Sequence, residues 1–243
     1  MDAQSFVSEL TRVFKDNGLG SLLSLEKSEK FYKLTERMLE ENEKYNLTAI
    51  TDPKKIILAH YADCAILAAK IKKGATLVDI GCGAGFPTLP LAILREDISI
   101  TAIDSTAKRI NYVNETAKML GLSGVIAISM RAEDGGKDPI YREKFDYATA
   151  RAVAEMRVLT ELCLPYVKVG GKFIAMKGKN ATAELSGAKR AIAILGGRGT
   201  AVEDILLKND EEELSHPLII ISKAEKTPAA YPRAYAQISK KPL

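Results

Sequence analysis

The chain is poor in the residues that build metal centres and disulfide scaffolds. It has three cysteines, two histidines and no tryptophan. Cys64, Cys82 and Cys163 lie far apart, and no two of them form a Cys-x-x-Cys pair. This pattern argues against a zinc knuckle and against a disulfide framework. With only His60 and His216 available, a histidine-based metal site is not expected either, so we predict a protein without metal.

The chain also lacks long apolar runs and a large excess of charge. No uninterrupted apolar stretch approaches the ~20 residues that cross a bilayer. The start, MDAQSFVSEL, has neither the basic residues nor the apolar run of a signal peptide. We therefore expect a cytoplasmic protein with no membrane partner. The formal net charge of +4 over 243 residues permits an anionic partner without requiring one.

After residue 75 the sequence alternates short apolar runs with amphipathic stretches, which predicts a mostly parallel sheet with helices on both faces. Strands are expected at Thr76–Ile80, Ile98–Ile103, Val125–Met130, Phe145–Ala150, Lys172–Met176, Pro217–Ser222 and, more weakly, near Gly199–Leu207. Helices are expected at Pro90–Leu94, Lys108–Leu120, Glu155–Val167 and Ala181–Leu195. The tail from Lys223 to Leu243 is expected to be irregular.

The first part of the chain has a different, helical character. We expect residues 1–68 to form an N-terminal helical extension and residues 69–243 to form the α/β domain, the two making one compact unit. Apolar residues recur at helical spacing within Glu29–Tyr45. Asp52 followed by Pro53 resembles an N-cap residue with proline at the first helical position.

The strongest local signal is the glycine turn VDIGCGAGFPTLP at 78–90. Gly81, Gly83 and Gly85 let the backbone turn sharply and let a ligand approach the main chain. Dinucleotide-binding enzymes use G-x-G-x-x-G beneath a pyrophosphate. Here the third glycine is one place early, and the Pro87 that follows Phe86 has no N–H for a phosphate. The turn therefore favours a cofactor without phosphates, such as S-adenosylmethionine.

Acidic residues follow the next two strands. Asp104 ends the second strand, 23 positions after Gly81, where a carboxylate accepts hydrogen bonds from both ribose hydroxyls in either cofactor class. After the third strand, Glu133 is placed to meet the adenine, and the small Ala132 before it leaves room for the ring. Asp79, inside the first strand, is a further candidate for polar contact with the amino-acid end of the cofactor.

A set of segments in a particular order and spacing extends this signal along the chain. They are YNLTAI (45–50), HYADC (60–64), VDIGCGAGFPTLPLAI (78–93), DSTAKR (104–109), RAED (131–134), ARAVA (150–154), LPYVKVGGKFIAMKG (164–178), YPR (231–233) and the final KKPL. Together they resemble the bacterial RsmG/GidB methyltransferases of small-subunit ribosomal RNA. The resemblance runs from about residue 20 to the C-terminus.

The resemblance implies a Rossmann-like class I methyltransferase fold with a seven-stranded, mostly parallel sheet. It also implies transfer of a methyl group from S-adenosylmethionine to guanine N7, leaving S-adenosylhomocysteine. The guanine lies in a hairpin loop of 16S rRNA, the 530 loop near the decoding site, so the partner is the small ribosomal subunit.

The same resemblance places five residues on cofactor-contacting positions: Gly81, Phe86, Ala132, Glu133 and Arg151. The chain departs from the family at two places. Thr88 stands where the family usually has glycine or serine, and Cys64 stands where it usually has serine. Since both substitutes are small, we expect the site to tolerate them.

Methylation of guanine N7 suits a site without a general base, because N7 carries a lone pair and no proton. Alignment of the reactants then supplies most of the reduction of the activation barrier. The chain has no Asn/Asp-Pro-Pro-Tyr motif and no Pro-Cys nucleophile. Arg151, just after the fourth strand, is a candidate for contact with the cofactor carboxylate or the target nucleotide; the alternative is an exposed salt-bridge arginine.

Four further residues are candidates for the substrate side, each with a plain structural alternative. His60 either helps to shape the substrate pocket or is a packed histidine on an apolar helix face. Asn46 either binds a guanine edge or caps a turn, and Lys177 either meets an RNA phosphate or is a solvated lysine. Tyr45, like Phe86, is a candidate for stacking on a base.

Two other functions remain open from the residues alone. One is a nicotinamide-dependent oxidoreductase, against which the G-x-G-x-G-F-P spacing argues. The other is a non-catalytic RNA-binding protein with a vestigial cofactor fold, against which the intact glycine turn, Asp104 and Glu133 argue.

Overall fold

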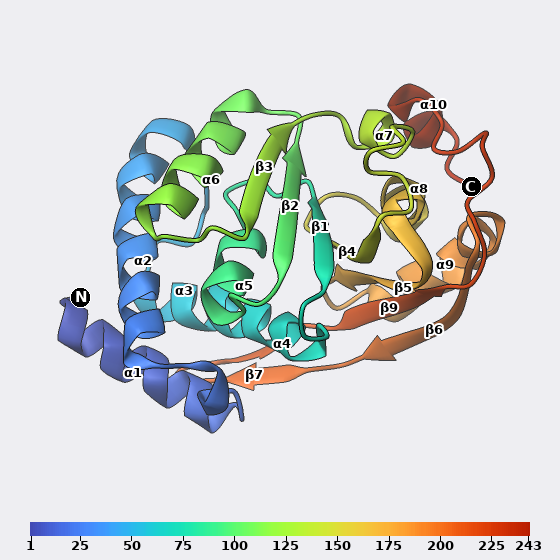
Figure 1. Cartoon of the computed structure of the whole chain (residues 1–243). Helices are drawn as coiled ribbons and strands as arrows, with labels where there is room; N and C mark the ends of the chain where they lie inside the picture. The colour runs from blue at the N-terminus through green and yellow to red at the C-terminus, as the bar shows by residue number, and fades with distance from the viewer.

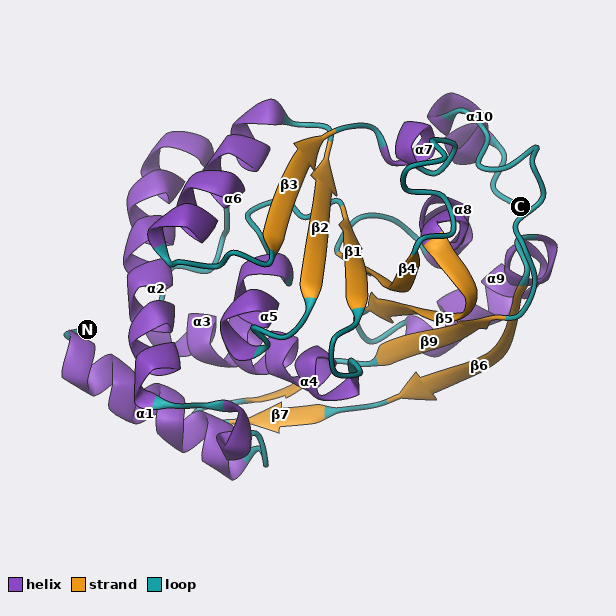
Figure 2. Ribbon diagram, in the orientation of Figure 1, coloured by secondary structure: helices purple, strands orange, loops and turns teal.

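The computed structural model describes the backbone of residues 1–243 and every side chain except that of Tyr45. Seven strands form one sheet in the order β3-β2-β1-β4-β5-β9-β6 (Figures 1 and 2). β1 to β5 are parallel to one another, and β9 is antiparallel to both β5 and β6. The predicted seven-stranded, mostly parallel sheet is therefore confirmed. The strands are β1 (Thr76–Ile80), β2 (Ser99–Asp104), β3 (Val125–Ser129), β4 (Phe145–Arg151), β5 (Val167–Met176), β6 (Gly197–Glu203) and β9 (Leu218–Lys223).

Helices cover both faces of this sheet, as the sequence predicts. Side chains alternate between faces along a strand, so Leu77 belongs to one core cluster and Val78 to the other. The first face is covered by α5 and α6 and the second by α8 and α9 (Figure 1). The helices of this region are α5 (Thr88–Leu94), α6 (Ala107–Met119), α7 (Ala132–Gly135), α8 (Met156–Cys163) and α9 (Ala181–Ile194).

The N-terminal helices pack on the first face. Phe14 of α1 and Phe31 of α2 belong to the same apolar cluster as Leu77 of β1, so one core continues from the N-terminal segment into the α/β region. The predicted cap is present: Asp52 Oδ1 accepts a hydrogen bond of 3.0 Å from Lys55 N–H. The N-terminal elements are α1 (Ala3–Asp16), α2 (Leu25–Tyr45), α3 (Pro53–Ile56), the π-helical turn η2 (Ile57–Ala62) and α4 (Asp63–Lys70).

Two predicted elements differ from the structure. The helix expected at Glu155–Val167 ends at Cys163, and Leu164–Tyr166 form a 3-10 turn that contains Pro165, which cannot continue an α-helix. The weak strand expected near Gly199–Leu207 is two strands. After β6 the chain leaves the sheet, and β7 (Leu206–Lys208) pairs with β8 (Glu213–Ser215) in a separate hairpin. This hairpin lies beside α1 because Asn17 exchanges hydrogen bonds with the Lys208 backbone.

The tail, expected to be irregular, is tied to the body and carries a short helix, α10 (Tyr235–Lys240). The Arg142 guanidinium donates to the carbonyl oxygens of Thr227 and Tyr231, both at 2.7 Å. Arg233 forms an ion pair of 2.6 Å with Glu161, which is fully buried in α8. These contacts bring α10 next to α7 (Figure 1). Within the described part of the chain, no helix has the length and apolar character to cross a membrane.

Candidate cofactor-binding and active site

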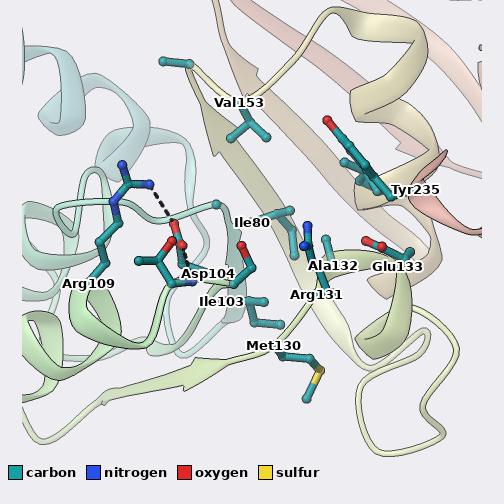
Figure 3. A pocket seen from close by; sticks show the side chains of 15 residues that line it. Ile80, Ile103, Asp104, Arg109, Met130, Arg131, Ala132, Glu133, Val153 and Tyr235 are labelled. Atoms are coloured by element: carbon teal, nitrogen blue, oxygen red, sulfur yellow. Dashed lines mark hydrogen bonds and ion pairs between the residues drawn. The ribbon is translucent and has the colours of Figure 1, made fainter. Parts of the chain in front are cut away.

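A cavity of about 280 Å³ lies at the carboxyl ends of β1, β2 and β3. Its apolar floor includes Ile80, Ile103 and Met130, and its acidic side chains are Asp104 and Glu133 (Figure 3). The order of the strands reverses between β1 and β4. Ligands of open α/β sheets bind at such a switch point, outside the carboxyl ends of the strands.

The glycine turn forms one wall of this cavity. Gly81 has a φ of +72°, and a Cβ placed there would lie 2.6 Å from Cγ2 of Val153. Only glycine therefore fits between the turn and the segment after β4. A Cβ at Gly85 would come equally close to Leu89 in α5. The Gly83 N–H donates to Asp104 at 3.1 Å, which joins the turn to the end of β2.

Asp104 is held in place by its own surroundings. Its Oδ1 accepts from Thr106 N–H at 2.8 Å, and its Oδ2 lies 3.6 Å from the Arg109 guanidinium. The residue is 7% exposed. A carboxylate has about four acceptor positions, so Asp104 keeps capacity for hydrogen bonds from a ligand; its contact with the cofactor stays a prediction.

The opposite side of the cavity is formed by α7 and α10. Ala132 and Glu133 begin α7, and the Ala132 carbonyl accepts from the Tyr166 hydroxyl at 2.6 Å. Tyr235 of α10 faces Asp104 and Arg109 across the cavity (Figure 3). An aromatic ring beside a carboxylate suits an adenine ring with its amino group. Tyr235 was missed by the sequence analysis because no periodic pattern marks the tail.

Asp79 lies beneath the turn, where the Thr88 hydroxyl is its hydrogen-bond partner. The Thr88 hydroxyl donates to Asp79 Oδ2 at 2.6 Å, whereas Oδ1 is buried without a partner among the described residues. Burial raises the pKa of Asp79 to about 7. Thr88, one of the two departures from the family pattern, therefore supports a buried carboxyl group. A serine could donate the same hydrogen bond, but a glycine could not.

Arg151 ends β4 and points toward the N-terminal helices. Its Nη2 donates to the Ala59 carbonyl at 2.9 Å and lies 2.8 Å from Nδ1 of His60. Because a guanidinium can only donate, Nδ1 must accept, and the proton of the neutral imidazole belongs on Nε2. That nitrogen lies 3.2 Å from the Thr48 hydroxyl. Burial, together with the Arg151 charge, lowers the pKa of His60 to about 4.

The residues around this pair come from the glycine turn and from the N-terminal segment. The Phe86 ring lies against His60, with 4.7 Å between ring centroids, and it does not line the 280 Å³ cavity. Its contact with the cofactor stays a prediction, as does that of Arg151. Cys64 is buried with Sγ 3.9 Å from Arg151 Nη1, and burial raises the pKa of its thiol. Among the described residues there is no group of three or more His, Cys, Asp or Glu that could hold a metal ion.

Lys177 follows β5 but is not a solvated lysine. Its Nζ lies 2.7 Å from Glu184 Oε2 and donates to the Ala154 carbonyl at 3.0 Å. The side chain is 11% exposed. Lys177 therefore fixes the segment after β4, and its contact with RNA stays a prediction.

Asn46 ends α2 as its C-cap, in the left-handed conformation with φ of +49°. It lines a hollow of about 300 Å³ with Thr106 and Arg109, which also line the 280 Å³ cavity. Asn46 is thus placed next to that cavity, and its role in the reaction stays a prediction. The side chain of Tyr45 lies outside the described part of the structure.

The neutral His60 has a consequence for stability in acid. Between its folded pKa of about 4 and the ordinary value of 6.5, the unfolded chain binds more protons, so acidification through this window weakens the fold. The loss approaches about 3 kcal/mol, since one pKa unit corresponds to about 1.4 kcal/mol. The raised pKa of Asp79 has the opposite effect, since acidification then stabilises the fold. Wild type and His60→Asn share this contribution, so it cancels in the difference between them. Urea unfolding from pH 7 to pH 4 should show a steeper decline for the wild type; parallel declines would contradict the assignment.

Comparison with known proteins gives the family. Residues 27–214 match the family model described as rRNA small subunit methyltransferase G. Ribosomal RNA small subunit methyltransferase G of Clostridium perfringens (strain 13 / Type A) is 46% identical over 229 residues, covering 93% of this chain and 95% of the relative. The Clostridium beijerinckii protein of that name is 46% identical over 227 residues, covering 93% and 94%.

Solved structures agree on the fold. A SAM-dependent O-methyltransferase from Thermotoga maritima has a TM-score of 0.53 at 16% identity, covering 79% of this chain and 72% of that one. A geranyl diphosphate methyltransferase in complex with sinefungin has a TM-score of 0.52 at 15% identity, covering 67% and 78%. At these identities the likeness concerns the fold alone. The cofactor is S-adenosylmethionine, and the chain belongs to the rRNA small subunit methyltransferase G family.

Proposed function

We propose that this protein transfers the methyl group of S-adenosylmethionine to N7 of a guanine in the 530 hairpin loop of 16S rRNA. The small ribosomal subunit is its partner and the cytoplasm its location. The family supports ribosomal RNA as the substrate class. The N7 assignment rests on the resemblance to the RsmG/GidB family. The state of His60 agrees with it: a lowered pKa keeps the imidazole neutral and its Nδ1 accepts from Arg151, and N7 carries no proton that a base would have to remove.

The chain's residues fit the cofactor. Asp104 would hold the ribose hydroxyls, and Glu133 and Tyr235 would flank the adenine. The Gly81 turn allows the close approach of the main chain. When bound, the cofactor supplies a methyl group activated by a sulfonium. The protein's contribution is to orient the guanine, to keep water out and to present the N7 lone pair in line with that group.

The test is to map 7-methylguanosine in 16S rRNA from a strain that lacks this protein, then restore wild type or Asp104→Asn. The modification should vanish and return only with wild type. Asp104→Asn should bind S-adenosylmethionine about 10- to 100-fold more weakly in calorimetry, because hydrogen bonds to charged groups contribute about 1.5–3 kcal/mol. Asp16→Asn, an equivalent change on α1, is the control. Unchanged 7-methylguanosine in the deletion strain would refute the proposal.

The non-catalytic alternative makes a different prediction for the same experiment. A vestigial fold would leave the rRNA unmodified in both strains and would not need an ordered Asp104. The hydrogen bonds that fix Asp104 to Gly83 and Thr106 favour a working cofactor site.

A further inference from the structure

A second cavity, of about 270 Å³, adjoins the cofactor cavity, and Ala152 lines both. Its other lining residues come from several elements, including Asp63 of α4, Arg151 of β4, Met176 of β5 and His216 between β8 and β9. This cavity therefore lies at the carboxyl ends of β4 and β5. Its volume is close to the lower limit of small-molecule sites, roughly 300–1,000 Å³, which suits a single nucleobase.

Asp63 presents unused acceptor capacity to this cavity. The residue is 2% exposed. Among the described residues, its carboxylate has ion-pair contacts within 4 Å with one arginine and one histidine. His216 Nδ1 lies 3.2 Å from Oδ1, and Arg151 Nη1 lies 3.5 Å from Oδ2. No described residue forms a hydrogen bond of good geometry with it. Since a carboxylate can accept about four hydrogen bonds and a buried charge needs partners, Asp63 is suited to a ligand with N–H donors.

Arg151 supplies a donor beside this acceptor. The two N–H groups of Nη2 are used by the Ala59 carbonyl and His60. Nη1, in contrast, makes two long contacts, a hydrogen bond of 3.9 Å to Cys64 Sγ and an ion pair of 3.5 Å with Asp63 Oδ2; a thiol is a weak acceptor, so an oxygen of a ligand can take over this donor. The guanidinium is thus anchored through one nitrogen and keeps donor capacity on the other.

This pairing of a carboxylate with a donor matches one nucleobase edge. The Watson–Crick edge of guanine carries two donors, N1–H and the 2-amino group, next to the O6 acceptor. Adenine has one donor and one acceptor on that edge and would leave a carboxylate oxygen facing its N1 lone pair. Enzymes that act on an extruded base commonly read this edge.

We propose that the second cavity holds the target guanine by its Watson–Crick edge, a step that rests on the proposed function. Asp63 accepts from N1–H and the 2-amino group, and Arg151 Nη1 donates to O6. N7 lies on the neighbouring Hoogsteen edge, beyond O6 from N1–H, so Asp63 does not cover it and it remains free for the methyl group delivered from the neighbouring cavity. Asp63 and Arg151 then determine specificity for guanine.

Binding of free nucleotides tests this assignment without any methyl transfer. With S-adenosylhomocysteine present, GMP, IMP and XMP are titrated at millimolar concentration and followed by NMR. Wild type should bind IMP, which lacks the 2-amino group, about tenfold more weakly than GMP. Asp63→Asn offers one acceptor to N1–H and one donor to the 2-oxo group of XMP, so its preference should move from GMP to XMP. Asp16→Asn should keep the wild-type order.

The outcomes separate this inference from the proposed function. Equal binding of GMP and IMP to wild type, no saturable GMP binding, or a GMP preference retained by Asp63→Asn would each overturn the assignment. The comparison on wild type needs no variant, and thermal stabilisation by S-adenosylhomocysteine shows whether Asp63→Asn is folded. Unchanged 7-methylguanosine in the strain that lacks the protein would refute the methylation and leave a measured GMP preference unexplained by it.

Discussion

Replacing Arg151 with methionine is expected to abolish methyl transfer and to lower the free energy of unfolding by about 3–5 kcal/mol. Methionine keeps much of the length of the side chain but removes every donor. The buried Asp63 carboxylate then loses its permanent positive neighbour, and the Ala59 carbonyl and His60 Nδ1 lose their hydrogen bonds. Methylation of small subunits from the deletion strain measures the loss of activity. Urea unfolding measures the loss of stability.

Arg151→Lys is the matched control, because it retains the charge but not the planar fork. A lysine at this position cannot serve His60, Ala59 and Asp63 together, so activity should remain low while stability recovers in part. Ordinary surface substitutions change the free energy of unfolding by no more than about 0.5 kcal/mol. If Arg151→Met stayed within that range of wild type, the structural role assigned to Arg151 would be wrong. Wild-type activity of Arg151→Lys would show that charge alone suffices.

Replacing Arg233 with methionine is expected to destabilise the protein by a similar amount, about 3–5 kcal/mol, since it leaves a buried charge without its partner. Glu161 is fully buried, and Arg233 donates to it from the backbone N–H at 2.8 Å and from Nε and Nη2 at 2.9 and 2.6 Å. Tyr235 follows two residues later and lines the cofactor cavity. The affinity for S-adenosylhomocysteine should therefore fall along with the stability.

The double variant Glu161→Gln/Arg233→Met distinguishes two contributions to the destabilisation: the loss of the ion pair and the cost of leaving the buried Glu161 carboxylate unpaired. Because the amide carries no charge, the double variant should be more stable than Arg233→Met alone, as a double-mutant cycle by urea unfolding would show. Simple addition of the two single effects would indicate that the residues do not act as a pair. Calorimetry on the same variants reports whether cofactor affinity follows the attachment of the tail.

The elements predicted from the sequence are those with a local signal. The strands from β1 to β5 appear as short apolar runs, and the turn at Gly81 follows from glycine spacing and an adjacent acidic residue. Asp104 was assigned from its position at the end of a strand, and the structure places it in the cavity. These features depend on a few neighbouring residues, so a single sequence suffices to find them.

The contacts that sequence reasoning could not find join distant residues. Arg151 meets His60 and Asp63 only because β4 ends beside the turn η2, about ninety positions earlier in the chain. The sequence predicted Lys177 to be either a phosphate-binding or a solvated lysine at a strand end, whereas its ion-pair partner Glu184 lies on the following helix. Spacing alone cannot show whether a charge at such an edge faces a ligand or a neighbouring carboxylate.

The contact between α1 and the β7–β8 hairpin has a consequence for how the chain matures during synthesis. The Asn17 amide donates to the Lys208 carbonyl at 2.8 Å and accepts from its N–H at 2.9 Å, across 191 positions. At a translation rate of about 5–20 residues per second, roughly 10–40 s pass between the synthesis of Asn17 and that of Lys208. Until the Lys208 backbone exists, α1 is held by its apolar contacts, such as that between Phe14 and Phe31, and its C-terminal end at Asn17 has no partner from the hairpin. In a nascent chain paused before Lys208, proteases should therefore cut near Asn17 more readily than in the finished protein.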